Sequence, residues 1–365
     1  MDPATVVGVG DVMIARYDET LLDPAAPVLQ AADFAFGNCE WPYSEEMGET
    51  HPVEAHLNDG VEGEDLFAPG DPKAVRLKGR KGFNVLFFAK NHCFHAGYRA
   101  FLRTMAVMRE SGIEPVGAGT TLVEALAPVV LERNGVRVAF VGCTSALLPG
   151  THAGRRTPEV APLRRHSYFR NPNWNDWGLA PQIGTLVDRE DLAALRASIR
   201  GARGLADVVV VSVHWGMVEG RVAIGDYQRE AAHAFIDHGA DLIFGHGTLV
   251  TKEIEVYRGK AIFYSLGKFL MKGPRPTGEV PIGVIAAVGK ETRKGIAALI
   301  GIVDRKISTV AFAPTFADAL SRPSFVTGDP AMFGEIAGDL AATSEAAGFS
   351  PAVNCRLRSR NSKAS

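Results

Sequence analysis

Residues 208–213 form the feature that most constrains the fold, because all six are Val or Ser. Such a short β-branched run without charges is typical of a buried strand. Similar apolar runs at residues 5–9, 34–36 and 84–88 are each followed by a polar loop and a helical pattern. Strands and helices that alternate in this order predict an α/β fold.

Later segments extend this pattern. Apolar residues at helical spacing predict a helix over residues 98–110. Asn134 and Gly135 both tolerate positive φ, so the apolar runs that flank them predict a β-hairpin over residues 129–141. We therefore expect a two-sheet sandwich covered by helices. Two more hairpins, expected to form a second sheet, are predicted at residues 254–257 with 261–264 and at residues 282–288 with 296–303.

Residues 149–184 interrupt the alternation, since they show neither a helical nor a strand period. The segment concentrates arginines and aromatic residues, and a long irregular segment inside a compact domain is usually functional or disordered. We expect an ordered lid that closes over the site and sets substrate choice; the alternative is a solvated surface loop. The chain is then one domain over residues 1–330 with this insert, followed by a C-terminal helix and basic tail over residues 331–365.

Composition excludes several classes of partner. Lys and Arg number 39 and Asp and Glu 41, which gives a formal charge of −2, so no overall field favours nucleic acid or a membrane surface. The four cysteines form no CxxC pair, and the N-terminus has no signal-like apolar run. From both we expect a cytoplasmic, non-membrane protein. The expected partner is a small molecule, and homo-oligomer formation is left open.

Candidate metal ligands follow the ends of five predicted strands. They are Asp11, the stretch Asn38-Cys39-Glu40, the pair Asn91-His92, His214 and His246. Because the carboxyl ends of strands form the ligand crevice of an open α/β sheet, these side chains are expected to converge. Carboxylate and amide oxygens suit ions such as Mn²⁺, and imidazole suits Zn²⁺ and iron. Each residue alone is more often a helix cap or a core residue, but the ordered set predicts a divalent-cation site.

Seven ordered motifs resemble those of the CapA family, which is named for poly-γ-glutamate capsule synthesis. They are Gly10-Asp11-Val12-Met13, Asn38-Cys39-Glu40-Trp41-Pro42, residues 90–97, Gly117-Ala118-Gly119, His214-Trp215-Gly216, residues 239–246 and residues 262–267. The resemblance covers residues 6–288. It implies a fold similar to that of the calcineurin-like metallophosphoesterases, a four-layer α/β/β/α sandwich that holds one or two metal ions.

The resemblance also implies residue roles. The implied metal ligands are Asp11, Glu40, Asn91, His214 and His246. Glu40 stands where the superfamily places a carboxylate that bridges two metals. His92 matches the histidine that protonates the leaving group or stabilises the transition state, and with Asp11 it forms the expected catalytic pair. The expected cofactor is one or two divalent ions per chain, Mn²⁺ or Zn²⁺ first and iron or Mg²⁺ after them.

Two departures from the family pattern favour a single metal. Leu249 stands where relatives carry the last histidine of Gly-His-His-Pro-His-Val, and Met13 stands where phosphatases carry a histidine. Only Asp11 and Glu40 remain of the expected ligands for the first metal. Phosphoryl transfer benefits from a two-metal clamp, so this loss favours an amide or related C–N bond over a phosphoester.

Five residues are predicted to bind the substrate. Lys90 and Lys268 stand where relatives carry asparagine, and two cations beside the site suit an anionic substrate; surface lysines, or lysines paired with acidic residues, are the alternative. His95 replaces the family's usual aspartate and is expected beside the site, with a supporting or core role as its alternative. Trp215 follows a predicted ligand, and Arg170 lies in the inserted segment, where a guanidinium could hold a carboxylate through two hydrogen bonds.

These expectations together predict a metal-dependent hydrolase that uses metal-activated water on a small anionic substrate. The favoured bond is an amide or related C–N bond. A phosphoesterase is the alternative. The further alternative is a non-catalytic factor in the biosynthesis or assembly of capsule polyglutamate, as the family name implies.

Overall fold

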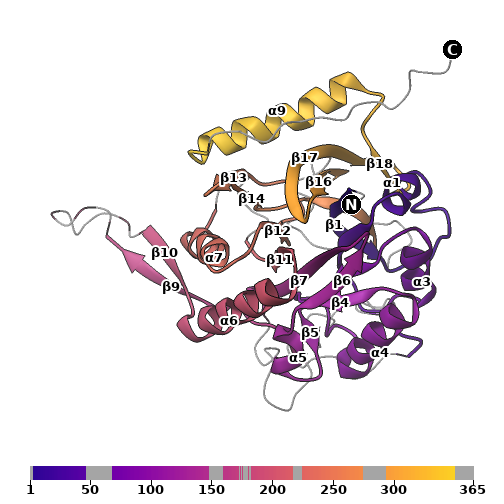
Figure 1. The fold of residues 1–365 in the computed structure, drawn as a ribbon, viewed down its shortest axis with the longest axis horizontal. Coiled ribbons are helices and arrows are strands. Elements are labelled where there is room, and N and C mark those ends of the chain that lie inside the picture. Colours follow the sequence, from indigo (N-terminus) through magenta and orange to yellow (C-terminus); the bar gives the residue numbers. More distant parts are fainter. Residues whose placement is uncertain are drawn as a thin grey trace.

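Two β-sheets packed face to face, with helices on their outer surfaces, form the fold (Figure 1). The computed structural model describes residues 3–46, 68–147, 159–171, 173, 175, 180, 182–216, 224–273 and 293–349. The arrangement is the four-layer α/β/β/α sandwich that the sequence predicts. Among the described residues, no helix is both long enough and apolar enough to cross a membrane.

The first sheet has eight strands in the order β18-β17-β16-β1-β2-β3-β4, with β15 paired to β1. Strands β2, β3, β4 and β15 run parallel to their neighbours, and β16, β17 and β18 are antiparallel. The strands are β1 (Ala4–Ile14), β2 (Phe34–Cys39), β3 (Val85–Phe87), β4 (Glu114–Val116), β15 (Lys268–Lys272), β16 (Lys294–Val303), β17 (Lys306–Ala317) and β18 (Pro323–Phe325).

The second sheet has six strands in the order β13-β14-β12-β11-β7-β6. Its central strands β7, β11, β12 and β14 are parallel, and β6 and β13 close the two edges antiparallel. The strands are β6 (Val129–Arg133), β7 (Val136–Thr144), β11 (Val208–His214), β12 (Leu242–His246), β13 (Ile254–Tyr257) and β14 (Lys260–Phe263). The Val-rich run at 208–213 is thus the buried central strand that the sequence predicts.

Helices cover both outer faces, and their apolar sides fit the sheets beneath them. These helices are α1 (Ala26–Gln30), α3 (Lys73–Arg80), α4 (Gly97–Glu110), α5 (Leu122–Leu126), α6 (Arg189–Leu205) and α7 (Asp226–Asp237). A further helix, α9 (Pro330–Ala346), lies across one side of the sandwich, where it contacts β13 of the second sheet and β17 of the first (Figure 1). Leu195, Ile199 and Phe235 pack α6 and α7 onto the second sheet. Between the sheets, Phe36 stacks on Phe140 with ring centroids 5.7 Å apart. The interior of the sandwich is therefore closely packed from two sides.

Two of the three predicted hairpins are confirmed. Asn134 and Gly135 turn between β6 and β7 with φ of 51° and 73°, and β13 pairs with β14. The third is wrong, because β16 pairs with β17 through Asp304 and Arg305, both at positive φ, while residues 282–288 lie outside the described residues. An Asp-Arg pair is not a usual signal for such a turn. The idea that these hairpins share a second sheet is also wrong, since β13 and β16 belong to different sheets.

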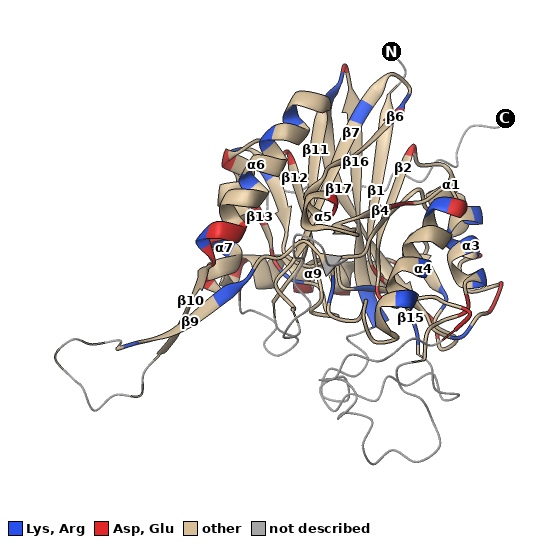
Figure 2. Ribbon diagram, turned by 90° about the horizontal axis from the view of Figure 1, so that it is seen from below, with Lys and Arg blue, Asp and Glu red and all other residues tan. Residues whose placement is uncertain are grey.

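The described part of the 149–184 segment is regular, which corrects the expectation of an irregular loop. β9 (Arg165–Arg170) and β10 (Gln182–Val187) form an antiparallel hairpin that lies beside α7 and extends to one side of the sandwich (Figure 2). All six residues of β9 are exposed, so the strand has no alternation of apolar and polar residues by which to recognise it. A short pair of strands, β5 (Ala118–Gly119) with β8 (Glu159–Val160), precedes the hairpin. Closure of this segment over the site stays a prediction.

Gly10 provides a test of the packing that brings β1 and β15 together. A Cβ atom at Gly10 would overlap the backbone carbonyl oxygen of Gly267, which also accepts a hydrogen bond from Asp11 N at 3.0 Å. We expect Gly10→Ala to lower the free energy of unfolding by about 2–4 kcal/mol, because the backbone must shift. Gly201→Ala is the control, since nothing lies within 4 Å of its added Cβ in α6 and alanine favours a helix. Chemical denaturation measures both; equal stabilities would contradict the close approach.

Candidate metal and substrate site

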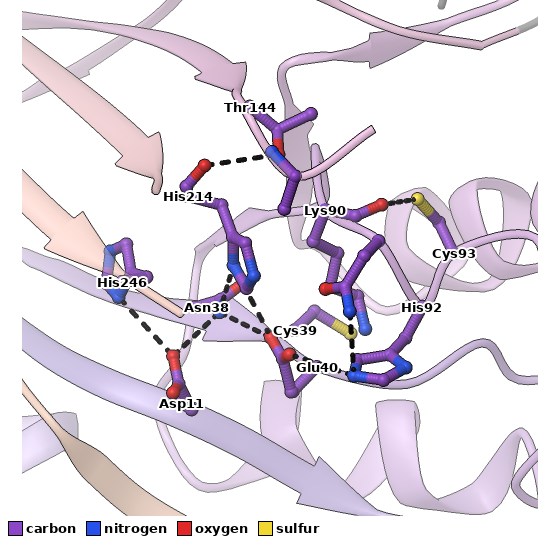
Figure 3. Close-up of polar contacts among 12 residues, drawn as sticks. Asp11, Asn38, Cys39, Glu40, Lys90, His92, Cys93, Thr144, His214 and His246 are labelled. Carbon is purple, nitrogen blue, oxygen red and sulfur yellow. Dashed lines mark hydrogen bonds and ion pairs between the residues drawn. The ribbon is translucent and has the colours of Figure 1, made fainter. Parts of the chain in front are cut away.

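The predicted ligands from four strands meet at one edge of the sandwich (Figure 3). Asp11 on β1 is in register with Asn38 on β2, and His214 at the end of β11 is in register with His246 at the end of β12. β1 does not end where the sequence suggests: it continues to Ile14, and its pairing shifts register on either side of Asp11. Such irregularities often redirect a side chain near a functional site. Both sheets therefore contribute to one cluster.

Asn38 is the central residue of this cluster; it belongs to a stretch of candidate ligands in the sequence but not to the ligand set that the family resemblance implies. Its Nδ2 donates to Asp11 Oδ1 at 2.8 Å and to Glu40 Oε2 at 2.6 Å, and it lies 3.4 Å from His214 Nδ1. The amide thus joins two carboxylates that would otherwise repel each other. The signal was present in the Asn38-Cys39-Glu40 stretch, where an asparagine and a glutamate two residues apart share one side of a strand.

The two histidines of the second sheet face these carboxylates. His214 Nδ1 is 3.8 Å from Glu40 Oε2, and His246 Nδ1 is 3.7 Å from Asp11 Oδ1. Burial, followed by the positive charge of Lys90, lowers the pKa of His214 to about 3. Burial and His214 lower the pKa of His246 well below its usual value. Both rings are therefore neutral near pH 7, the form in which imidazole binds a metal.

The rings of Phe36 and Phe87 hold the His246 ring in place. Their centroids lie 5.9 Å and 5.7 Å from that of the imidazole, and all three rings are buried. These ring contacts, together with complete burial, restrict the orientation of the imidazole. His246 is consequently a fixed group, as a ligand should be.

Several buried polar atoms of the cluster have no hydrogen-bond partner among the described residues. They are Asp11 Oδ2, Asn38 Oδ1, Asn91 Oδ1 and both ring nitrogens of His246. Such atoms are costly to bury unless something satisfies them. No three His, Cys, Asp or Glu side chains in the described ranges converge closely enough to hold an ion as they stand. The donor set still fits a divalent cation, because its unsatisfied atoms are the oxygens and imidazole nitrogens that such ions bind.

Burial and crowding shift the pKa values of the two carboxylates. Burial, then the charge of Glu40, raises the pKa of Asp11 well above its usual value, although Asn38, Lys268 and Lys90 oppose the rise. Burial likewise raises the pKa of Glu40 against Lys90, Asn38 and Lys78. A bound cation would favour the ionised form of both groups.

His92 lies at the more open side of the cluster. Its side chain is 22% exposed, and its Nε2 is 3.8 Å from Glu40 Oε1 and 3.2 Å from Asn91 Nδ2. Its Nδ1 lies 3.1 Å from His95 Nε2, and the His95 ring packs edge-on against Trp41. Burial, followed by His95, lowers the pKa of His92 well below its usual value. The structure thus places His95 against His92, where it can orient that ring.

Two of the predicted substrate-binding lysines are brought to the cluster. Lys90 and Lys268 are 1% and 8% exposed, so neither is a surface lysine. The other alternative, that they pair with acidic residues, agrees with the charge interaction of both lysines with Asp11. Lys268 is in register with Asp11 across β1 and β15. Their contact with a substrate stays a prediction.

The other two predicted substrate contacts lie elsewhere. Trp215 is buried, and its Nε1 donates to the carbonyl oxygen of Tyr264 at 3.0 Å, so it packs the second sheet instead of facing a substrate. Arg170 is the last residue of β9, where its guanidinium donates to Gln182 at 3.1 Å. Among the described residues no contact joins it to the cluster. For Trp215 the reason is that position next to a motif in sequence does not fix which way a side chain points. The contact of Arg170 with a substrate depends on closure of its segment and stays a prediction.

A buried lysine behind β2 was also missed by the sequence analysis. Lys78 of α3 donates to the Tyr43 hydroxyl at 2.8 Å and approaches Cys39 Sγ at 3.5 Å. Burial lowers its pKa, and Lys78 in turn lowers the pKa of Glu40. The ammonium group of Lys78, behind β2, therefore favours the ionised form of the Glu40 carboxylate. A lysine in an amphipathic helix gives no sequence signal of such a role.

Fold and site together define an α/β sandwich protein with a candidate metal centre where its two sheets meet. The family model "Bacterial capsule synthesis protein PGA_cap" matches residues 5–273. The chain therefore belongs to this family, and the resemblance to CapA is confirmed.

Three relatives illustrate the match. The chain is 30% identical over 272 residues to the PGA biosynthesis protein CapA of Bacillus subtilis (strain 168), covering 72% of this chain and 62% of that protein. It is 30% identical over 277 residues to the capsule biosynthesis protein CapA of Bacillus anthracis, covering 73% and 59%. It is 28% identical over 302 residues to a probable polyglutamine synthesis accessory protein of Mycobacterium tuberculosis, covering 73% and 74%. The match thus spans about three fifths of the two Bacillus proteins.

Two solved structures are similar at low identity. A hypothetical protein from Thermus thermophilus is 13% identical with a TM-score of 0.44, over 85% of this chain and 98% of that one. A putative 5'-nucleotidase from Staphylococcus aureus is 12% identical with a TM-score of 0.46, over 93% of this chain and 58% of that one. Likeness at this level does not bear on the chemistry of the site.

Metal content tests the cluster directly. We expect the purified chain to bind Mn²⁺ or Zn²⁺, and His214→Ala to lower the affinity by about 10-fold or more, because a neutral imidazole ligand is removed. His166→Ala is the matched control, since this imidazole is exposed on β9 and pairs with Asp188. Elemental analysis after dialysis gives the answer; equal metal content in both variants would contradict the assignment.

Metal-free protein should lose stability as pH rises. The pKa values of Asp11 and Glu40 are raised by folding, so above the ordinary carboxyl pKa of about 4 the folded chain retains protons that the unfolded chain has lost. The contribution of these two groups then falls from roughly pH 4 upward through the raised pKa values. His92, His214 and His246, whose pKa values are lowered, act in the opposite direction up to the ordinary imidazole pKa of about 6.5. We therefore expect Tm measured with a chelator to fall between about pH 6.5 and pH 7.5, and to fall less in Asp11→Asn. Identical slopes for both proteins would show that Asp11 is not strained by burial.

Proposed function

We propose that this chain is a metal-dependent hydrolase that acts on a small anionic substrate. The observation that carries the proposal is the group of unpartnered buried atoms on Asp11, Asn38, Asn91 and His246. A purely structural cluster would pair these atoms with each other, because each unpaired buried polar group costs about 1–3 kcal/mol. A site that keeps them unpaired is instead prepared for a ligand.

The residues of the cluster would have separate roles in binding the ion and in the reaction. Asp11, Glu40, Asn91, His214 and His246 would hold the ion, with Mn²⁺ or Zn²⁺ preferred for this mixture of oxygen and nitrogen donors. A divalent cation bound there would polarise the scissile bond and lower the pKa of a water molecule. His92 would act at the leaving group, by proton transfer or, in the neutral form that its lowered pKa favours, as a hydrogen-bond donor that stabilises the transition state. It is the more exposed imidazole, and His95 contacts its Nδ1.

The favoured bond is an amide or related C–N bond. Met13 and Leu249 are buried and supply neither oxygen nor nitrogen, which supports a single ion and leaves no two-metal clamp for phosphoryl transfer. The names of relatives also support this preference, because they refer to the synthesis of PGA and of polyglutamine. Phosphoester hydrolysis is the alternative reaction.

A non-catalytic role has an observation in its favour as well. The relatives are named biosynthesis or accessory proteins, and none of the three names refers to hydrolysis. In that case the cluster would bind an anionic segment of polymer without cleaving it. Turnover separates the two functions.

A substrate panel combined with His92→Ala tests the proposal. We expect the Mn²⁺- or Zn²⁺-loaded chain to cleave amides of small carboxylic acids faster than phosphoesters. His92→Ala should lower kcat by roughly 10²-fold or more, which is the usual contribution of general acid catalysis, and should leave the metal content unchanged. His238→Ala serves as the control and should keep wild-type turnover, since this residue follows α7 and precedes β12, at the opposite end of that strand from His246.

Each outcome has one meaning. Faster cleavage of phosphoesters would replace the amide hydrolase with a phosphoesterase. Loss of metal in His92→Ala would make this residue a ligand instead of an acid. A metal-loaded chain without turnover on either panel would favour the accessory role.

A further inference from the structure

Two buried carboxylates and two buried lysines share the cluster. Asp11 and Glu40 are enclosed, and so are Lys90 and Lys268. Lys268 faces Asp11 in the strand register, and Lys90 precedes the Asn91 ligand directly. Two side chains of each sign are therefore enclosed in one cluster.

The ammonium of Lys90 has no hydrogen-bond partner in the described part of the chain. A buried, unpaired ammonium is costly by several kcal/mol unless nearby negative charge compensates it. The carboxylates of Asp11 and Glu40 provide some of that compensation, and an anionic ligand would provide the rest.

The charges limit how many metal ions the cluster accepts. Ionised beside a bound cation, Asp11 and Glu40 would carry two negative charges, which the two lysines would balance. One divalent ion would therefore leave a net double positive charge in a buried space, to which Lys78 behind β2 adds further. A second divalent ion would double that excess where Coulomb repulsion is strong.

We propose that Lys90 and Lys268 are built-in counter-cations, so that the cluster takes one divalent ion and uses the remaining positive charge to bind a dianion. The ligand class is a small molecule with two carboxylates, or one carboxylate beside a developing oxyanion. The part concerning the dianion rests on the proposed function, whereas the part concerning the metal does not.

Titration of the metal-free full chain with Mn²⁺ at pH 7 tests the role of the lysines. We expect one ion per wild-type chain by isothermal titration calorimetry. Lys268→Met and Lys90→Met should each bind Mn²⁺ at least about tenfold more tightly, because each removes a repelling charge while keeping a side chain of similar length. Lys306→Met should match the wild type, since this exposed lysine lies near the first residues of β1, at the opposite end of the strand from the cluster.

Lys268→Arg protects the test against a folding defect. It retains the charge and should retain wild-type Mn²⁺ affinity, and thermal melting shows whether each variant is folded. Unchanged or weaker Mn²⁺ binding in both folded methionine variants would overturn the proposal. Two ions per wild-type chain would do the same.

Glutarate is the probe for the dianion. Its affinity for the Mn²⁺-loaded chain should fall at least about tenfold in Lys90→Met and Lys268→Met, and not in Lys306→Met. Equal glutarate affinity in all of these proteins would overturn the dianion part. A chain that shows the expected Mn²⁺ and glutarate affinities but cleaves nothing would refute the hydrolase and leave the counter-cations standing.

Discussion

The hydrogen bonds from one amide to two carboxylates are the constraint on which this site depends. Asn38 Nδ2 reaches both Asp11 and Glu40, at 2.8 Å and 2.6 Å, inside a sandwich that admits almost no water to either acid. Like charges so enclosed would force one another to protonate, as their raised pKa values show. The amide offsets part of this repulsion with donor hydrogens, and the lysines offset more. The strand geometry around them therefore has to be rigid, which explains the close backbone approach at Gly10.

Much of the fold could be predicted from the sequence, because its central strands and helices carry strong local patterns. The Val-rich β11 and the Asn134-Gly135 turn are such cases, and both are as predicted. The predictions fail where the local sequence pattern does not reflect the tertiary environment of the segment. β9 is exposed along its whole length and so has no apolar period, and the β16–β17 turn places Asp304 and Arg305 at positive φ without Asn or Gly. Packing and backbone geometry, not residue type, decide those two elements.

The candidate site also has some features that the sequence predicts and others that it does not. The sequence predicts correctly that Asp11, Glu40, His214 and His246 converge, because the carboxyl ends of parallel strands lie at one edge of a sheet. Direction of the side chain could not be predicted. Trp215 turns into the second core and donates to Tyr264, although it follows His214 directly in the chain. The burial of Lys90 was likewise hidden, because nothing local distinguishes an enclosed lysine from an exposed one.

Unequal exposure within the cluster indicates how a substrate would enter it. Asp11 and His246 are fully enclosed, whereas His92 remains partly open to solvent beside Trp41. A ligand that approaches from this side meets His92 before it meets the carboxylates, so its leaving group would rest near the imidazole while its reacting bond lies deeper. Lys90 and Lys268, which are buried with the acids, would then hold the anionic end of the ligand in the enclosed part, where charge interactions are least screened. With the proposed function, depth in the cluster would separate the imidazole that moves a proton from the lysines that hold the substrate's charge.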